Sequence, residues 1–334
     1  MEVYNERHAE PDFIQWIYPM TTTAPRIVVV GSANVDLIVR SDRLPGPGET
    51  VIGGDCLTAG GGKGANQAIA IRRLGGMVSF VARIGDDDPG RRIESSLKAE
   101  GLDLAALTVD KQAPTGVALI MVDQSGQNMI SVAPGANGRL SPNDVRQADT
   151  LIRRADVLVV QLEVPLDTVR AALEAARASG VMTVLNPAPA RQVSSELLAL
   201  VDWLTPNEFE ASTLTGVAVA DANDAIEAGR ILLDRGAQNV VITLGSRGAI
   251  YLTKTAIERI DPFQVAAIDT VAAGDAFTGG LAVSLARRRS VGDSLAFASA
   301  AGALATTRRG AQPSLPTESD VDRLIATRAV SVRG

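Results

Sequence analysis

Residues 156–186 read DVLVVQLEVPLDTVRAALEAARASGVMTVLN, and this stretch decides the fold class. A short apolar run at 156–161 is followed by an Ala-rich amphipathic segment at 165–179 and a second β-branched run at 182–186. Strand, helix and strand in this order predict a βαβ unit, whose two strands lie parallel in one sheet. The continuous apolar character of the first run is typical of a parallel strand covered on both faces.

The same alternation extends in both directions along the chain. Further strands are predicted at 26–31, 79–84 and 239–244, and further helices at 66–74 and 221–234. We therefore expect an α/β fold with a doubly wound, mainly parallel sheet flanked by helices, in one domain spanning residues 25–330. Ligands of such folds bind at the carboxyl ends of the strands.

Two regions interrupt the alternation. Residues 35–57 are rich in turns around Pro45-Gly46-Pro47-Gly48, and residues 115–132 predict a hairpin that turns near 123–126. Neither region has a crossover helix, so together they predict a small antiparallel β lid over the ligand crevice, able to exclude water. An antiparallel extension of the main sheet is the alternative.

Composition limits the chemistry. The chain of 334 residues has one Cys (Cys56) and one His (His8), too few for a disulfide framework or a Cys/His zinc site. A His-based triad could use only His8, which lies near the N-terminus, apart from the expected α/β domain. Lys and Arg number 32 against 38 Asp and Glu, which argues against a nucleic-acid partner and favours a small-molecule substrate. Catalysis should therefore depend on carboxylates, lysine, backbone amides and a hard cation.

Residues 1–24 differ from the rest and are expected to form a disordered or loosely docked extension, with Met20 as an alternative start to Met1. They lack the basic start and apolar stretch of a signal peptide. No run reaches the roughly 18 to 20 apolar residues of a membrane span, so no membrane association is expected. A lone cysteine suits a reducing cytosol, and we expect a cytoplasmic protein.

Residues 269–277, DTVAAGDAF, set a carboxylate after small residues and before an apolar helix. Backbone N–H groups at a helix start, together with the helix dipole, favour an anion such as phosphate. Asp275 could take a proton from a hydroxyl that attacks that phosphate, so the stretch indicates a phosphoryl-transfer centre. An Asp that only caps the helix is the alternative.

Residues 60–67, GGGKGANQ, form a second glycine-rich segment before a predicted helix. The segment is not a Walker A motif, because the required first glycine is missing and Lys63 is followed by Gly instead of Ser or Thr. The glycines would let a ligand approach the backbone, with Lys63 and Asn66 as polar contacts. A flexible loop that ends in a helix, with Lys63 at the surface, is the alternative.

Both glycine-rich segments match signatures of a known family, and from about residue 26 to 316 the sequence resembles the PfkB family of ribokinase-like carbohydrate kinases. The blocks that carry the likeness, in chain order, are GSANVD (31–36), AGGGKGANQA (59–68), QLE (161–163), NPAPA (186–190), TPNEFE (205–210), TLGSRG (243–248), DTVAAGDAF (269–277) and RGAQPS (309–314). The resemblance implies ATP-dependent transfer of a γ-phosphoryl group to the 5-hydroxyl of D-ribose, which gives ribose 5-phosphate and ADP. Another sugar or nucleoside (deoxyribose, fructose, adenosine) is the alternative substrate.

The resemblance also implies roles for individual residues. Asp275 would be the catalytic base, and the amides of Ala272, Ala273 and Gly274 would form the anion hole. The implied sugar-binding set is Asn34, Asp36, Gly62, Lys63, Asn66, Glu163 and Asp275. The implied ATP-binding set is Asn186, Asn207, Thr243, Gly245, Ser246, Gly248, Gly274 and Ser299.

Cations and a partner are implied as well. Asn207 and Glu210 match an N-x-x-E element similar to one that holds Mg²⁺ through water. Asp269 and Ser314, with the carbonyls of Val271, Ala305, Arg308 and Gly310, would form a K⁺ site. An Asp269 that only caps the turn at Thr270 is the alternative. The family further implies a homodimer joined through the β lid.

Two other functional classes fit less well. A dinucleotide-dependent oxidoreductase needs G-x-G-x-x-G after the first strand, and residues 31–34 (GSAN) do not supply it. A non-catalytic sugar-binding module would have no need of Asp275 and its preceding glycine.

Overall fold

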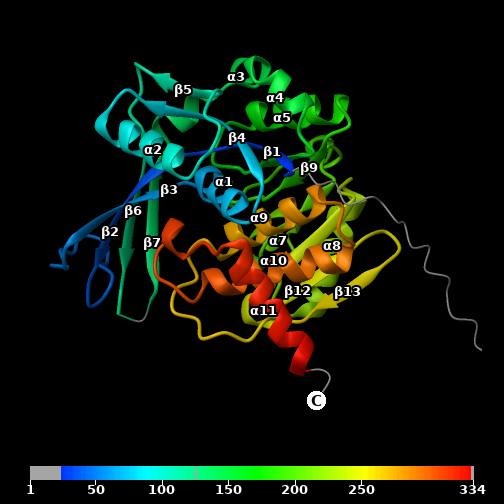
Figure 1. Cartoon of the computed structure of the whole chain (residues 1–334). Coiled ribbons are helices and arrows are strands. Elements are labelled where there is room, and N and C mark those ends of the chain that lie inside the picture. Colours follow the sequence, from blue (N-terminus) through cyan, green and yellow to red (C-terminus); the bar gives the residue numbers. More distant parts are fainter. Residues whose placement is uncertain (1–23, 125, 332–334) are drawn as a thin grey trace, which may run out of the picture.

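The computed structural model describes residues 24–124 and 126–331 (Figure 1). The extension expected at residues 1–24 falls outside these ranges except for Ala24, so that expectation stays a prediction. Within the described part of the chain, no helix is both long enough and apolar enough to cross a membrane.

The predicted α/β fold is confirmed by a nine-stranded sheet of order β13-β12-β11-β10-β9-β8-β1-β4-β5 within the described residues. Neighbouring strands are parallel except β11–β12 and β12–β13, which are antiparallel. The strands are β1 (Arg26–Val30), β4 (Met77–Gly85), β5 (Leu107–Asp110), β8 (Val157–Val160), β9 (Met182–Leu185), β10 (Trp203–Leu204), β11 (Asn239–Thr243), β12 (Ala249–Leu252) and β13 (Ile257–Ile260). All five strands predicted above are present.

Helices cover both faces of this sheet, because alternate residues of each buried strand point to opposite sides. In β1, Ile27 and Val29 belong to one buried cluster and Val28 and Val30 to the other. The first cluster includes residues of α1 (Lys63–Arg73), α2 (Asp88–Ala99), α9 (Ala273–Ala286), α10 (Val291–Ala305) and α11 (Glu318–Ser331). The second includes residues of α3 (Pro142–Gln147), α4 (Asp149–Arg153), α5 (Leu166–Ala178), α6 (Ser195–Leu198), α7 (Glu208–Thr215) and α8 (Ala222–Asp234).

The two regions that interrupt the alternation form a separate sheet, not an extension of the main one. Within the described residues this small sheet has the order β3-β2-β6-β7 and extends from one side of the body (Figure 1). Its strands are β2 (Asn34–Arg40), β3 (Cys56–Gly61), β6 (Gly116–Val122) and β7 (Asn128–Ala133). The predicted hairpin is β6–β7, and the central β2–β6 pair is parallel.

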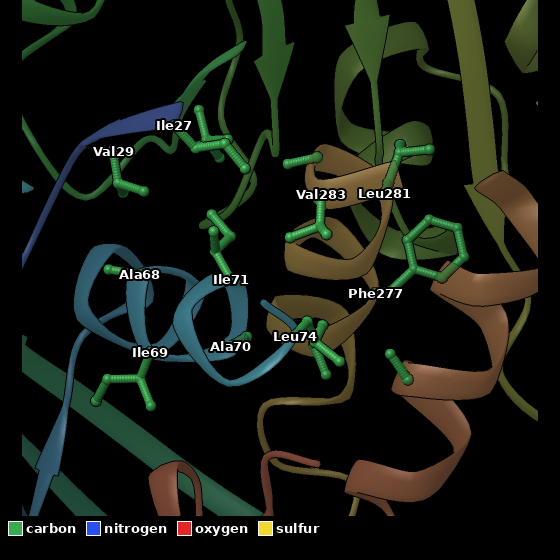
Figure 2. Close-up of a cluster of buried hydrophobic side chains, with 14 of the residues drawn as sticks. Ile27, Val29, Ala68, Ile69, Ala70, Ile71, Leu74, Phe277, Leu281 and Val283 are labelled. Atoms are coloured by element: carbon green, nitrogen blue, oxygen red, sulfur yellow. The ribbon is translucent and has the colours of Figure 1, made fainter. Parts of the chain in front are cut away.

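Close packing brings the two signature helices together. Figure 2 shows α1 and α9 side by side, with Ile27 and Val29 of β1 above them. A Cβ on Gly279 of α9 would lie 2.8 Å from the Cβ of Ala70 on α1, so only glycine allows this approach. The polar residues at the starts of both helices therefore lie within reach of one another.

The position of β1 between β8 and β4 in the main sheet indicates where a ligand can bind. β1 pairs with β8 on one side and β4 on the other, so the chain direction across the sheet reverses at β1. Crevices at such a switch point, beyond the carboxyl ends of the strands, are where ligands of open α/β sheets bind. Asn34 follows β1 and Glu163 follows β8 at this edge.

Candidate active site

A cavity of about 340 Å³ is lined by every residue of the predicted sugar-binding set. Ala272 and Gly274 of the predicted anion hole line it too, as do Asn186, Asn207 and Thr243 of the predicted ATP set, and Glu210. Residues from α1, α9 and the small sheet thus meet at the switch point, as parallel α/β folds require.

Asp275 is the centre of this cavity and does not cap its helix. The N-cap of α9 is Ala272, in the left-handed conformation with φ 61°, and it makes no side-chain capping bond. The Asp275 carboxylate instead accepts hydrogen bonds from Asn66 Nδ2 and Gln67 Nε2, each at 3.0 Å. The capping interpretation is therefore wrong, and the helix start has no side chain in the place of an anion.

The protonation of Asp275 reflects opposing influences. Burial raises the pKa of its carboxyl above the ordinary value, because the charged form loses hydration. The positive charge of Lys63 and the two amide donors lower that pKa, whereas Glu163 adds to the rise. A raised pKa suits a general base, since it increases the affinity of the carboxylate for a substrate proton.

Lys63 is not a surface lysine. It begins α1, lines the cavity and is partly buried. Burial alone would lower its pKa, but the charges of Asp275, Glu163 and Glu210 outweigh that effect and the pKa is raised. Lys63 thus stays a cation inside an acidic cavity and can attract phosphate.

Glu163 joins three segments beside the cavity. Its Oε2 accepts the Lys63 backbone N–H at 2.9 Å and the Ser32 hydroxyl, while the Gly64 N–H donates to Ser32 Oγ at 3.3 Å. A carboxylate from the loop after β8 therefore satisfies the first amide of α1 directly and the Gly64 amide through the Ser32 hydroxyl, where the helix dipole favours negative charge. The other oxygen, Oε1, has no protein partner among the described residues.

Asp36 is a second acidic group with a shifted pKa. Burial raises the pKa of its carboxyl to about 7, and the nearby Glu163 and Asp275 charges contribute to that rise. Only 8% of the residue is exposed. Asp36 has no ion pair within residues 24–124 and 126–331, and a buried carboxylate of this kind is expected where a polar ligand completes the site.

A chain of buried amides contacts Asp275, and two of its members, Gln67 and Gln161, were not predicted as site residues. Gln161 Nε2 donates to Gln67 Oε1 at 2.6 Å, Gln67 Nε2 donates to Asn186 Oδ1 as well as to Asp275, and Asn186 Nδ2 donates to the Thr205 carbonyl. Gln67 and Gln161 both lie within the blocks that carry the family resemblance, but the sequence analysis gave neither residue a role in the site. Their role depends on contacts between segments about 90 residues apart, which no local pattern reveals.

Of the residues predicted for the nucleotide, Asn186, Asn207, Thr243 and Gly274 line the cavity. Asn207 caps α7 in a capping box: its N–H donates to Glu210 Oε2 at 2.9 Å, and Glu210 N–H donates to Asn207 Oδ1 at 2.8 Å. Burial raises the pKa of Glu210. The remaining predicted nucleotide residues are outside the cavity lining: Gly245 and Ser246 are exposed, and Gly248 and Ser299 are partly buried. Ala273 is also outside it.

The loops predicted to hold K⁺ meet beside the start of α9. Asp269 Oδ2 accepts the Gly310 N–H at 2.9 Å, and Oδ1 accepts the Val271 N–H at 3.1 Å. The second bond is the turn cap considered as the alternative, and the first joins the two loops. Ser314 Oγ donates to the Ala311 carbonyl, and Ala305 and Arg308 precede this loop.

The small sheet contributes apolar side chains to the cavity that the sequence analysis did not single out. They are Ala118, Ile120, Ile130 and Val132, with the polar Asn128. Further lining residues that were not predicted are Thr205, Thr270, Phe277, Thr278 and Ala311. Strand geometry could have found the first group, because even-numbered residues of the predicted hairpin share one face.

Comparison with known proteins agrees with this geometry. The sequence model of the pfkB family of carbohydrate kinases matches residues 24–318. The chain is 43% identical over 294 residues to the ribokinase of Haemophilus influenzae, covering 88% of this chain and 96% of that protein. A deoxyribokinase of Salmonella typhi is 35% identical over 292 residues, covering 87% and 95%.

Solved structures show the same fold. The Arabidopsis thaliana ribokinase, solved in complex with ribose and ATP, aligns with a TM-score of 0.82 at 33% identity, over 90% of this chain and 99% of that chain. A ribokinase from Thermotoga maritima aligns with a TM-score of 0.80 at 33% identity, over 90% and 99%.

Proposed function

The chain belongs to the pfkB family of carbohydrate kinases, and from that membership we propose that it transfers the γ-phosphoryl group of ATP to the 5-hydroxyl of D-ribose. The products are D-ribose 5-phosphate and ADP. One observation carries the proposal: the buried Asp275 carboxylate shares a cavity with all the residues expected to bind the sugar, beside a helix start without a side-chain cap.

In the proposed reaction, Asp275 accepts the proton of the sugar hydroxyl. The hydroxyl oxygen forms a bond to the γ-phosphorus, and the bond from that phosphorus to the bridging oxygen breaks, which releases ADP. Backbone amides of Ala272, Ala273 and Gly274 stabilise the charge on the transferring group. The Lys63 ammonium, which lines the same cavity, adds positive charge.

Asn207 and Glu210 are the proposed holders of Mg²⁺. Each Glu210 oxygen accepts one hydrogen bond from Asn207, at 2.9 and 3.1 Å, and a carboxylate oxygen has lone pairs for further donors. The pair therefore fits a cation that keeps its waters and takes its direct ligands from phosphate oxygens. The ion would neutralise charge on the triphosphate. Asn186, Thr243, Gly245, Ser246, Gly248 and Ser299 remain the proposed contacts of ATP.

A K⁺ ion is proposed beside the anion hole, held by Asp269, Ser314 and the carbonyls of Val271, Ala305, Arg308 and Gly310. The hydrogen bond from Gly310 N–H to Asp269 supports this set, because it joins the two loops that carry the oxygens. Oxygen donors suit a hard cation. Its charge would order the segment that presents the anion-hole amides.

The decisive test measures ADP release and the phosphorylated product with purified protein, ATP, Mg²⁺ and ribose, in K⁺ and in Na⁺. Ribose 5-phosphate should form faster in K⁺. A panel of 2-deoxyribose, fructose and adenosine tests the substrate, because a deoxyribokinase is among the relatives. Absence of transfer to every sugar in both salts would refute the proposal.

We also propose a homodimer joined through the small sheet, acting in the cytoplasm. Support for the dimer comes from apolar side chains exposed on that sheet, among them Leu119 and Met129. The described Cys56 is exposed and forms no disulfide, which fits a reducing compartment. Sedimentation equilibrium tests the dimer, and fractionation of the source cells tests the compartment.

A further inference from the structure

Asn137 is a buried side chain that holds Asn34 from outside the cavity. It lies in the 3₁₀ turn η1 (Gly135–Arg139) and is 1% exposed. Its Oδ1 accepts the Ala33 N–H at 2.9 Å, and its Nδ2 donates to the Ala33 carbonyl at 3.1 Å and to Asn34 Oδ1 at 2.7 Å. No residue of the turn lines the cavity.

The backbone of Ala33 fixes the orientation of both amides. A backbone N–H can only donate and a carbonyl can only accept, so Asn137 must turn its oxygen to the first and its nitrogen to the second. The second hydrogen of that nitrogen then requires an acceptor on Asn34. Asn34 therefore faces Asn137 with its oxygen and the cavity with its NH₂ group.

This arrangement gives Asn34 one chemical role toward a ligand. Asn34 lines the cavity, and its Nδ2 has no acceptor within the described residues. Asp36 lies two residues further along the same strand, and its carboxylate also lines the cavity and can accept a hydrogen bond. A donor and an acceptor side by side suit hydroxyl groups, each of which accepts and donates.

We propose that Asn137 is the positioning residue that makes Asn34 a hydrogen-bond donor to the sugar, and so determines which hydroxyl the enzyme requires. The inference rests on the proposed sugar kinase activity. With Asn34 inverted, its oxygen would join Asp36 as a second acceptor, and a sugar hydroxyl there would have no donor.

The surroundings hold Asn137 in this position. A Cβ at Gly116 would lie 2.3 Å from Asn137 Nδ2 and from Asn34 Oδ1, so the pair fits only because residue 116 is glycine. Ala136 N–H donates to the Pro114 carbonyl at 2.8 Å, and Arg139 pairs with Asp110 at 3.1 Å. The turn is thereby fixed to the segment that leads into β6.

The first test is Asn137→Asp. An ionised Asp can accept the Ala33 N–H but cannot donate, so Asn34 would turn its NH₂ group toward it. We expect KM for ribose to rise about 10- to 100-fold, the effect of one lost donor and one unpaired polar group. The kcat at saturating ribose and KM for ATP should change less than about twofold. Asn143→Asp, an exposed position six residues further on, is the matched control and should behave as wild type.

Deoxy sugars supply a second readout. Wild type should discriminate against the monodeoxy ribose (2-deoxy or 3-deoxy) that lacks the hydroxyl facing Asn34, and Asn137→Asp should lose most of that discrimination. If Asn137→Asp does not fold, the same measurements are made on Asn137→Leu, which introduces no buried charge. Thermal unfolding checks that each variant is folded.

A double-mutant cycle isolates the route through Asn34. In the Asn34→Ala background, Asn137→Leu should leave KM for ribose within about twofold of the single variant. An equal rise in KM in both backgrounds, or a fall in kcat with KM for ribose unchanged, would overturn the inference. Wild type without ribose kinase activity would instead refute the proposed function, which keeps the two failures distinct.

Discussion

The polar cluster around Asp275 and the small sheet depart from the usual distribution of side chains in opposite ways. In the cluster, Asp36, Gln67 and Asp275 are at most 8% exposed, although polar groups normally face water. On the face of the small sheet that points away from the cavity, Leu119 and Met129 are about half exposed, although large apolar groups normally avoid water. Both departures are typical of binding surfaces, for a polar ligand in the first region and for an apolar surface in the second.

The contrast also separates catalysis from assembly. Buried carboxylates reduce the stability of the free protein but are held ready for chemistry, whereas exposed apolar groups become favourable only on contact with a second surface. Four variants test this division, taken here from the largest expected effect to the smallest.

Asp275→Asn should have the largest effect. The variant keeps the shape of the side chain but cannot take up the substrate proton, so kcat should fall at least about 100-fold while ribose binding changes little. Steady-state kinetics and calorimetric titration of ribose measure the two quantities. Asp234→Asn, at an exposed position on α8, is the matched control. Retention of more than about a tenth of the wild-type kcat would show that Asp275 is not the general base.

Leu119→Asp addresses the small sheet. Ile120 and Ile130 face the cavity, so the opposite face, with Leu119 and Met129, is free to contact a second copy. A symmetric interface would contain the substitution twice. Loss of about 1.5 kcal/mol or more of apolar burial at each copy would weaken the proposed dimer about 100-fold. Sedimentation equilibrium measures the dissociation constant. Ile257→Asp, on edge strand β13, is the control. A dimer unaffected by Leu119→Asp would place the interface elsewhere.

Much of this comparison was predictable from the sequence. The βαβ periodicity gave the main sheet, and the two helix-free regions gave the small sheet, because both patterns are local. The seven sugar-set residues were assigned by resemblance and do meet in one cavity. Asn137 and the pairing of Gln161 with Gln67 were not predictable, because an amide acquires its role from partners about 100 residues away. Ala272 was named only for its amide, and its left-handed backbone gave no sequence signal.

Asp36→Asn tests whether the acidic cluster destabilises the empty enzyme. Burial raises the pKa of Asp36 to about 7 in the folded state, from 3.8 as its ordinary value. Between these pH values the folded state binds more protons than the unfolded state, so the wild type loses stability as pH rises from about 4 to above 7. Asn cannot ionise, and the variant should gain on the order of 2 kcal/mol over wild type at pH 8 and little at pH 4. Urea unfolding at both pH values gives the difference, with exposed Asp55→Asn as control. An equal gain in stability at both pH values would exclude ionisation of Asp36 as the cause.

Gln67→Met should have the smallest effect, and it asks whether the buried amides act on catalysis through proton affinity. Gln67 Nε2 donates to Asp275 Oδ1 at 3.0 Å, and a donor to the charged form lowers the pKa of a carboxyl. Met fills a similar volume without a donor, so the pKa of Asp275 should rise further, and the acid limb of the kcat/KM profile should move to higher pH. A shift of about one pH unit corresponds to a tenfold loss of activity below the limb and little loss above it. The exposed Gln238→Met is the control. The same loss at every pH would mean that Gln67 only orients the carboxylate, because a change in geometry, unlike a change in proton affinity, is not recovered when the pH is raised.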